Sequence, residues 1–396
     1  MRAPALPPTV LVSAGEASGD LYAAGLVRAL RRRWEKAAFF GCAGPELAKA
    51  GVEPVIEASS LAVVGLVEVV RHIPRIAMEF LKLKRAAEHR KPDLAILTDS
   101  PDFHLRFAPR LRAMGVPVLY LVAPQVWAWR KGRIHTIRRN VNRLACIFPF
   151  EEQFFRNHGV PADYIGHPLS WLIRAGASRE AFCEKHGIPM AKPIVALLPG
   201  SRAGEVMRHL PVLGEAARRL AQEREAAFVV GLPQGLLGRV GEREFLSRLG
   251  PLPVRIVEGE TWDLEACAEL ALAASGTVTV EAALFGVPMV TFYRVSEATW
   301  RLGRPLVETP FFTMVNLVAG RKVVPELIQR ECTGERIAAE ALRLWNDPAA
   351  MAKMKEGLAE VRRALHGEVD PFERAAAIAE EILAARDGRH SVGMRN

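Results

Sequence analysis

Short apolar runs alternate with helical patterns of about 10–15 residues along most of the chain, as in parallel-sheet proteins. Runs such as TVLVSA, LAILT, IVALL and LALAA lead into loops of small or polar residues, and a helical pattern follows each loop. A run that is apolar at every position indicates a strand buried on both faces. The pattern therefore predicts βαβ units in doubly wound α/β sheets.

The alternation breaks near residues 168–190 and then starts again. From Pro325 on, the apolar spacing predicts helices only. We expect an α/β protein of two Rossmann-like parallel-sheet domains that face a central cleft, followed by a helical C-terminal segment. The expected parts are residues 1–175, residues 176–345, helices at 346–386 that pack back on the N-terminal domain, and a disordered tail at 387–396.

Length and composition agree with two domains and narrow the class of partner. The chain has 396 residues, with 53 basic and 44 acidic side chains and a net charge of +9. A basic balance favours an anionic partner. Because no recognisable nucleic-acid module accompanies it, a phosphorylated or lipidic partner is favoured. Five cysteines without a C-x-x-C pair, and histidines without H-E-x-x-H, argue against a disulfide framework or a zinc site.

The segment 59–84 is strongly apolar, but Glu68, Arg71 and Pro74 interrupt it. No apolar run in the chain reaches the roughly 20 residues that span a bilayer. The segment could lie on a membrane surface, and an ordinary amphipathic core helix explains the same pattern. The candidate membrane contacts are Val63, Val64, Leu66, Val67, Val70 and Ile73.

Two loops in the second half of the chain have the composition of anion-binding loops. In LLPGSRAGEV, the small residues Gly200 and Ser201 precede a helix, and Arg202 could bind a diphosphate through paired hydrogen bonds. In ASGTVTVEAAL, the residues 275–277 precede a helix that carries Glu281, whose carboxylate could hold ribose hydroxyls. Plain strand-to-helix turns, with Ser201 as a helix cap and Glu281 in solvent, are the alternative.

Three further motifs carry polar or aromatic residues at expected loops. SAGEASGD contains Ser18 and Gly19, which either bind a ligand or start a helix. VWAWRKGR places Trp127 beside Arg130, which suits a phosphorylated sugar, although a core tryptophan and a solvated basic helix are the commoner arrangement. Asn316 lies in a third expected loop.

The motif TDSPDF places two carboxylates where a strand ends and a helix begins. Proline favours the first helical position, with Ser, Asp or Asn just before it. Ser100 is therefore the expected N-cap and Pro101 the first helical residue, and Asp102 complements the helix dipole. Asp99 has no such structural explanation and is the candidate for chemistry.

Together these motifs resemble the lipid-A-disaccharide synthase family. SAGEASGD, DSPDF, VWAWR, PFE, IGHPL, LLPGSR, ASGTVTVEAAL and NLVAGRKVVPELIQ follow one another in the family's order, over about residues 10–385. The resemblance implies the two-domain GT-B glycosyltransferase fold, with the acceptor and the membrane on the N-terminal domain and the UDP-sugar on the C-terminal domain. This chain departs from the family's sequence at two places. It has Gly41-Cys42-Ala43-Gly44 where the family has G-x-G-G after the second strand, and it differs at Gln125.

The implied reaction joins UDP-2,3-diacylglucosamine to the 6-hydroxyl of 2,3-diacylglucosamine 1-phosphate and forms the β(1→6) disaccharide of lipid A and UDP. The resemblance also implies a protein peripheral to the cytoplasmic face of the inner membrane that needs no metal or other cofactor; a homodimer is possible. An α-linked donor and a β-linked product require inversion, for which we assign Asp99 as base and Arg202 as the group that stabilises UDP. The UDP-sugar candidates are Gly200, Ser201, Arg202, Ser275, Gly276, Thr277, Glu281 and Asn316, and the acceptor candidates are Ser18, Gly19, Trp127 and Arg130.

Three alternatives remain at this point. A peptidoglycan N-acetylglucosaminyltransferase would carry a G-G-T-G-G-H loop where this chain has SAGEASGD. A UDP-sugar epimerase would not need the apolar segment 59–84. A basic, non-catalytic lipid- or nucleic-acid-binding protein would leave Asp99 and the two anion loops unexplained.

Overall fold

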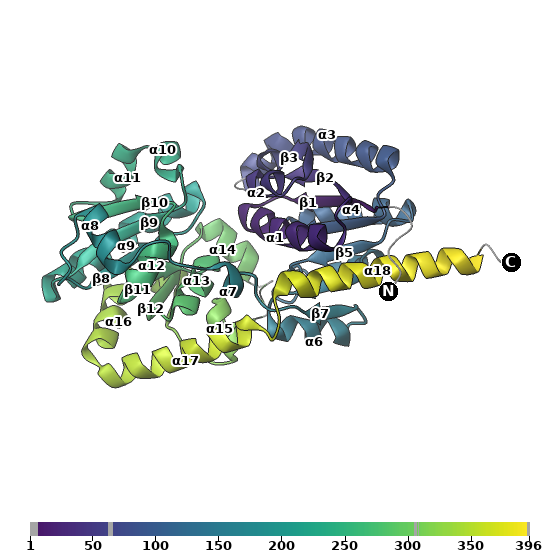
Figure 1. The fold of residues 1–396 in the computed structure, drawn as a ribbon. Coiled ribbons are helices and arrows are strands. Elements are labelled where there is room, and N and C mark those ends of the chain that lie inside the picture. Colours follow the sequence, from purple (N-terminus) through teal and green to yellow (C-terminus); the bar gives the residue numbers. More distant parts are fainter. Residues whose placement is uncertain (1–6, 62–65, 305–306, 308, 394–396) are drawn as a thin grey trace. The chain divides into compact units, whose positions relative to one another are not determined.

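The computed structural model describes residues 7–61, 66–304, 307 and 309–393, without the side chains of residues 66–73, 302 and 387–393. The chain divides into two compact units: residues 1–171 with 365–396, and residues 172–364. Each unit is built on one parallel sheet with helices around it (Figure 1). This is the predicted α/β architecture, with a parallel sheet in each half.

The first unit has a seven-stranded sheet in the order β3-β2-β1-β4-β5-β6-β7, and each neighbouring pair is parallel. The central strand β4 is buried at every residue, because helices cover both faces of the sheet. The strands are β1 (Thr9–Ala14), β2 (Ala38–Ala43), β3 (Glu53–Glu57), β4 (Leu94–Thr98), β5 (Val118–Leu121), β6 (Arg143–Cys146) and β7 (Ala162–Tyr164).

The helices of the first unit form two groups. α1 packs against α2 and α18, and α4 packs against α3 and α5. These helices are α1 (Ala17–Arg33), α2 (Pro45–Lys49), α3 (Leu66–Arg90), α4 (Pro101–Ala113), α5 (Ile134–Asn140), α6 (Pro149–Asn157) and α18 (Pro371–Gly393). Short 3-10 helices lie at Ala58–Ser60 and Lys131–Arg133.

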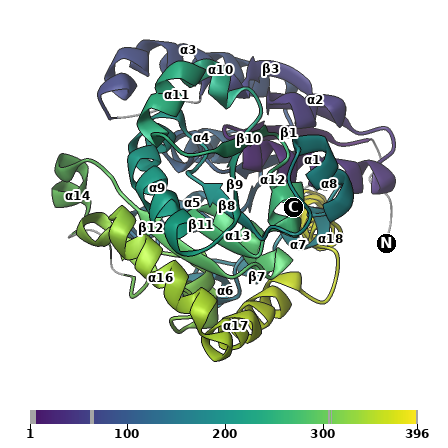
Figure 2. The same cartoon turned by 90° about the vertical axis from the view of Figure 1, so that its left-hand side faces the viewer.

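The second unit has a six-stranded parallel sheet in the order β10-β9-β8-β11-β12-β13. Figure 2 faces this unit and shows α9 and α16 side by side, as their contacts also indicate. The strands are β8 (Ile194–Leu198), β9 (Ala227–Leu232), β10 (Val254–Glu258), β11 (Leu270–Ala274), β12 (Met289–Tyr293) and β13 (Glu326–Ile328). The helices are α8 (Arg179–His186), α9 (Ala203–Glu223), α10 (Leu236–Val240), α11 (Glu242–Leu249), α12 (Thr261–Cys267), α13 (Thr277–Phe285), α14 (Glu297–Gly303), α15 (Met314–Ala319) and α16 (Gly334–Asn346), with a 3-10 helix at Gln329–Glu331.

Strand β13 differs from the prediction that only helices follow Pro325. It has three residues and pairs in parallel with β12 at the edge of the sheet. So short an edge strand carries too little periodicity to be recognised, because only one of its residues is buried.

The chain passes between the units in α7 (Leu169–Leu172) and near the end of α17 (Pro348–His366). The helical segment expected at 346–386 is thereby divided: nearly all of α17 belongs to the second unit, and α18 belongs to the first. Helix α18 continues to Gly393, through part of the segment expected to be disordered.

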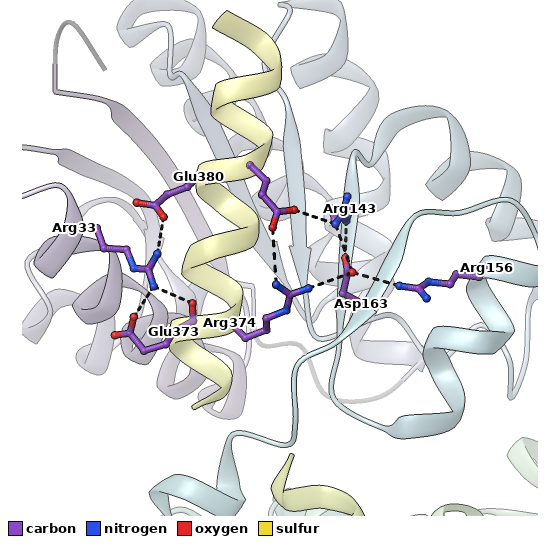
Figure 3. A network of polar contacts seen from close by, with 8 residues as sticks. Arg33, Arg143, Arg156, Asp163, Glu373, Arg374 and Glu380 are labelled. Carbon is purple, nitrogen blue, oxygen red and sulfur yellow. Dashed lines mark hydrogen bonds and ion pairs between the residues drawn. The ribbon is translucent and has the colours of Figure 1, made fainter. Parts of the chain in front are cut away.

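Ion pairs line both flanks of α18 (Figure 3). On one flank, Arg33 of α1 pairs with Glu373 at 2.7 Å and with Glu380 at 2.5 Å. On the other flank, Asp163 of β7 accepts from Arg143 at 2.5 Å and lies 3.7 Å from Arg374 of α18. These contacts fix the last helix of the chain to the first unit.

The candidate membrane segment falls largely outside the described part of the chain. Val63 and Val64 lie outside the described residues, and so do the side chains of Leu66, Val67, Val70 and Ile73. Farther along α3, Met78 is 56% exposed and Leu81 47% exposed. Among the described helices, none is both long enough and apolar enough to cross a membrane.

Candidate active site

Each sheet contains one place where the strand order reverses: between β1 and β4 in the first unit, and between β8 and β11 in the second. The connections leave these neighbouring strands toward opposite faces, so a crevice forms at their carboxyl ends, where open α/β sheets bind ligands. SAGEASGD spans the end of β1, the loop after it and the start of α1, and DSPDF follows β4. LLPGSR ends β8, and ASGT ends β11. All four motifs therefore lie at the carboxyl ends of the strands where an open α/β sheet binds its ligands.

The carboxylate of Asp99 is held by the loop after β1. Its Oδ1 accepts a hydrogen bond from Gly15 N–H at 2.9 Å, and its Oδ2 accepts one from Glu16 N–H at 3.1 Å. Burial raises the pKa of Asp99 to about 7, and the hydrogen bonds from Gly15, Ser100 and Glu16 oppose that rise. A carboxylate with a pKa near neutrality suits proton transfer at neutral pH.

The small residues of SAGEASGD are required by the close approach of the DSPDF loop. A Cβ on Gly19 would lie 1.6 Å from Asp99 Oδ2, and a Cβ on Gly15 would lie 2.2 Å from Ser100 Oγ. Gly19 was predicted to bind the acceptor; the structure places it against the carboxylate of Asp99. Ser18, the neighbouring candidate, is half-buried.

The backbone of DSPDF is unusual where the chain leaves β4. Asp99 has a φ of 52° and Ser100 a φ of 36°, so two consecutive residues other than glycine are in the left-handed region. Each such residue costs roughly 1–2 kcal/mol. Helix α4 begins as predicted, with Ser100 as N-cap and Pro101 as the first helical residue. Among the described residues, the side chain of Ser100 makes no capping hydrogen bond to the helix.

Asp102 lies in the first turn of α4, as predicted, and it also holds two basic side chains. Arg130 Nη1 lies 3.1 Å from Asp102 Oδ1, and Arg133 pairs with the same oxygen. The guanidinium of Arg130 stacks on the ring of Trp129 with 4.3 Å between its Cζ and the ring centroid. Because Trp129 is 40% exposed, this stack presents an aromatic and cationic surface to solvent.

Trp127, the tryptophan chosen from the sequence, is buried. Its indole N–H donates to Glu151 Oε1 at 3.0 Å, and Glu151 Oε2 accepts from the backbone N–H groups of Ile147 and Phe148. The motifs VWAWR and PFE therefore hold each other in place. Trp127 and Trp129 are two residues apart and would share one face of an extended segment, so no local pattern shows that only Trp127 is buried.

Asp20, the last residue of SAGEASGD, caps helix α2 from a distance. Its Oδ1 accepts from Gly44 N–H at 2.8 Å and its Oδ2 from Glu46 N–H at 2.8 Å. Ala43, which stands at the second glycine of the family's G-x-G-G, is buried at the end of β2, and the neighbouring Cys42 donates its thiol to the carbonyl of Ala14 at 3.0 Å.

In the second unit, the loop after β8 turns at Gly200, whose φ is 114°. Helix α9 begins at Ala203 with Arg202 as N-cap, so Ser201 is not the cap. Buried His209 of α9 joins this loop to the loop after β12: its Nδ1 lies 2.8 Å from the carbonyl of Pro199, and its Nε2 accepts from Arg294 N–H at 3.2 Å. Gly200, Ser201 and Arg202 therefore form an anchored loop at the amino end of a long helix.

The loop after β11 presents Gly276 and Thr277, both exposed, at the start of α13. Ser275 Oγ donates to the carbonyl of Phe312 at 2.9 Å. Burial raises the pKa of Glu281, on α13, to about 7, and a hydrogen bond with Trp262 opposes the rise. Glu281 is half-buried and lies about one helical turn beyond Thr277.

Asn316 is fully buried and its amide is used within the protein. Its Nδ2 donates to Val324 O and to Glu326 Oε1, each at 2.9 Å, and its Oδ1 accepts from the N–H groups of Val323 and Val324. Glu326 Oε1 also accepts from Thr313 N–H at 2.8 Å. Asn316 thereby supports the loop at Phe312 that contacts Ser275.

The described residues contain no group of three His, Cys, Asp or Glu side chains placed to hold a metal ion. The two units instead present a carboxylate supported by backbone N–H groups in one, and two helix amino ends with an arginine in the other. The first can accept a proton, and the second can hold a diphosphate.

Comparison with solved structures shows the same two-domain fold. UDP-GlcNAc 2-epimerase from Neisseria meningitidis, solved bound to UDP-GlcNAc, aligns with a TM-score of 0.63 and 13% identity over 95% of this chain and all of its own. The glycotransferase of kitacinnamycin aligns with a TM-score of 0.62 and 17% identity over 95% of this chain and 99% of its own. At these identities the likeness establishes the fold, GT-B, and nothing finer.

Sequence comparison is more specific. The family model for lipid-A-disaccharide synthetase matches residues 10–381. The lipid-A-disaccharide synthase of Solibacter usitatus is 56% identical, and that of Myxococcus xanthus is 47% identical, each over 95% of this chain and 98% of the relative. The family suggested by the motif order is confirmed, and this chain belongs to the lipid-A-disaccharide synthases, a family of glycosyltransferases.

Proposed function

We propose that this protein transfers the diacylglucosamine of UDP-2,3-diacylglucosamine to the 6-hydroxyl of 2,3-diacylglucosamine 1-phosphate. The products are the β(1→6) disaccharide of lipid A and UDP. The observation that carries the proposal is Asp99, a carboxylate of raised pKa at the switch point of the first sheet, in a chain of this family. The change from an α-linked donor to a β-linked product requires one displacement with inversion.

Asp99 acts as the general base in this proposal. Its carboxylate takes the proton of the acceptor 6-hydroxyl as the oxygen attacks the anomeric carbon and the bond to UDP breaks. The N–H groups of Gly15 and Glu16 orient the carboxylate and leave it further lone pairs for the substrate. A pKa of about 7 allows it to be unprotonated before the reaction and still basic enough to take the proton.

The second unit binds the donor. The amino ends of α9 and α13 direct backbone N–H groups and helix dipoles toward an anion, and Arg202 supplies a guanidinium for the diphosphate. These groups stabilise the charge that develops on the leaving UDP. Glu281 accepts hydrogen bonds from the ribose hydroxyls, and Asn316 contributes through the loop it supports.

The acceptor surface lies on the first unit. The exposed stack of Trp129 and Arg130 suits a sugar that carries a phosphate, because the ring offers an apolar face and the guanidinium a charge. Trp127 has no exposed face to offer. The exposed Met78 and Leu81 of α3, with the net charge of +9, support a peripheral position on an anionic membrane surface.

The test is UDP release from purified protein given both diacyl sugars, each one alone, or neither. Release only with both supports transfer and excludes an epimerase, which needs no acceptor. Asp99→Asn should lower kcat at least 1000-fold, at the upper part of the range for general-base catalysis, while UDP binding measured by calorimetry stays within twofold. Near-normal turnover of Asp99→Asn would refute the assignment of the base.

Asp102→Asn is the matched variant, because it alters the other carboxylate of the same motif by the same atoms. Asp102 orients Arg130, so its loss should raise KM for the acceptor and leave kcat nearly unchanged. A kcat loss equal to that of Asp99→Asn would show that the motif, rather than one carboxylate, carries the activity.

A further inference from the structure

A chain of buried hydrogen bonds ends on the main-chain carbonyl of Asp99. The hydroxyl of Tyr120, on β5, donates to this oxygen at 2.6 Å. The Nδ1 of His104, on α4, lies 2.9 Å from the same oxygen, and the Nε2 of His104 lies 2.7 Å from the Oγ of Ser13 on β1. His104, Tyr120 and Ser13 are all fully buried. Side chains of β5 and α4 therefore meet at one backbone oxygen, and β1 holds the far side of the His104 ring.

The direction of each hydrogen bond follows from the partners. A carbonyl oxygen only accepts, so Nδ1 of His104 must carry the proton and Nε2 must accept from Ser13. Burial lowers the pKa of His104 to about 4 and raises the pKa of Tyr120 well above its usual value. Both side chains are therefore neutral donors at neutral pH, and the arrangement has one fixed polarity.

The carbonyl belongs to a residue whose conformation needs support. Asp99 and Ser100 both have positive φ values, of 52° and 36°, which disfavour this backbone relative to the ordinary helical or extended one. Two hydrogen bonds to the Asp99 carbonyl are made only while the peptide faces Tyr120 and His104. They offset the strain of the turn.

The backbone turn at Asp99 and Ser100 also determines where the carboxylate of Asp99 lies. With this backbone, the side chain of Asp99 reaches the N–H groups of Gly15 and Glu16. If Asp99 and Ser100 left the left-handed region, the chain would follow another path from β4, the Cβ of Asp99 would move relative to the loop after β1, and these two bonds would lengthen. The main-chain contacts on one side and the carboxylate contacts on the other thus act on the same residue.

We propose that His104 and Tyr120 are positioning residues that hold Asp99 in its left-handed conformation and thereby aim its carboxylate at the acceptor hydroxyl. This inference rests on the proposed role of Asp99 as base. Neither side chain touches substrate; each acts through the Asp99 peptide. Their loss should lower kcat and leave KM for both substrates and the affinity for UDP nearly unchanged.

The test uses conservative changes in the full-length protein. Tyr120→Phe removes only the hydroxyl, and we expect kcat to fall about tenfold, the effect of one well-placed hydrogen bond. His104→Gln places its amide nearer the former Nε2, and His104→Asn places its amide nearer the former Nδ1. Because the Nδ1 position faces Asp99, His104→Asn should retain more of the wild-type kcat than His104→Gln.

The matched control is His158→Gln. His158, on the first unit, also places its Nδ1 near a backbone carbonyl, that of Phe154 at 2.8 Å, but it is exposed and lies at the C-cap of α6. Its replacement should leave kcat within twofold of the wild type. Thermal unfolding of every variant shows whether the protein is folded at the assay temperature.

A double-mutant cycle separates positioning from general destabilisation. In an Asp99→Asn background, Tyr120→Phe should cause no further loss of the residual turnover, because its effect passes through the carboxylate. An additional tenfold loss in that background, or an unchanged kcat for both Tyr120→Phe and His104→Gln alone, would overturn the proposal. If Asp99→Asn itself keeps normal turnover, the base assignment fails instead, so the two failures are distinguishable.

Discussion

Replacing Gly19 by alanine is the most direct probe of the Asp99 site. The new Cβ would lie 1.6 Å from Asp99 Oδ2, whereas unbonded carbon and oxygen atoms stay about 3.3 Å apart, so the carboxylate must move by about 1.7 Å. Such a movement breaks the hydrogen bonds from Gly15 at 2.9 Å and Glu16 at 3.1 Å. A displacement of about 1 Å in a catalytic group can cost about 100-fold in rate.

We therefore expect Gly19→Ala to lower kcat by about 100-fold or more. The fold should survive, because Gly19 lies in α1, where alanine favours the helix by about 1 kcal/mol over glycine and offsets part of the steric strain. UDP affinity should not change, since the donor loops belong to the second unit. The assays are steady-state UDP release, calorimetric UDP binding and thermal unfolding.

Gly238→Ala is the control, since Gly238 also lies in a helix and a Cβ there would meet no atom within 4 Å among those the structure describes. It should leave kcat unchanged and leave the melting temperature equal or slightly higher. Retention of kcat within threefold in Gly19→Ala would refute the reasoning, because the carboxylate would then not need its present position.

Two further predictions concern buried carboxyl groups. Because Asp99 must be unprotonated to act as base and its pKa is about 7, kcat/KM should fall about tenfold per pH unit below that value and level off above it; a profile flat from pH 5 to 8 would contradict this. Glu265 is fully buried, and neither carboxylate oxygen has a hydrogen-bond partner among the described residues. Burial, and to a smaller extent the charge of Glu281, raises the pKa of Glu265 in the folded protein. As the pH rises, the unfolded chain therefore releases this proton before the folded protein does. The contribution of Glu265 to the stability of the fold declines over the pH range between the unfolded and the folded pKa. Glu265→Met should therefore raise stability by about 1–3 kcal/mol at pH 8 and by less at pH 5, as measured by calorimetric unfolding, and an equal effect at both pH values would contradict the buried, unpaired state.

The separation of Asp99 from Asp102 shows what local sequence rules can achieve. Capping preferences alone placed Ser100 and Pro101 at the start of α4, as the structure confirms. The same rules explained Asp102 by the helix dipole and offered no structural role for Asp99, which therefore became the candidate for chemistry. They could not show that Asp102 also holds Arg130 and Arg133, because that contact joins the first turn of α4 to the segment after β5, and the two come together only in the folded unit.

Trp127 and Asn316 show the opposite case. Both were chosen from short motifs as binding residues, and the structure buries both with their polar groups used inside the protein. The partner of Trp127, Glu151, lies in another motif, and the partner of Asn316, Glu326, lies ten residues farther along the same motif. Short polar motifs in this chain thus include residues that support a loop as well as residues that could touch a ligand, and composition does not distinguish the two.

By itself, the sequence determined the repeating strand and helix pattern, the division into two α/β halves, the loops at strand ends and the family. These properties depend on periodicity and on neighbouring residues, which a linear chain displays directly. Only the tertiary structure decided that His104, itself held by Ser13, meets Tyr120 at the carbonyl of Asp99, and that Gly19 must lack a side chain. The physical reason is that strand order brings β1, β4 and β5 side by side, and such contacts depend on which elements become neighbours, which no local pattern records.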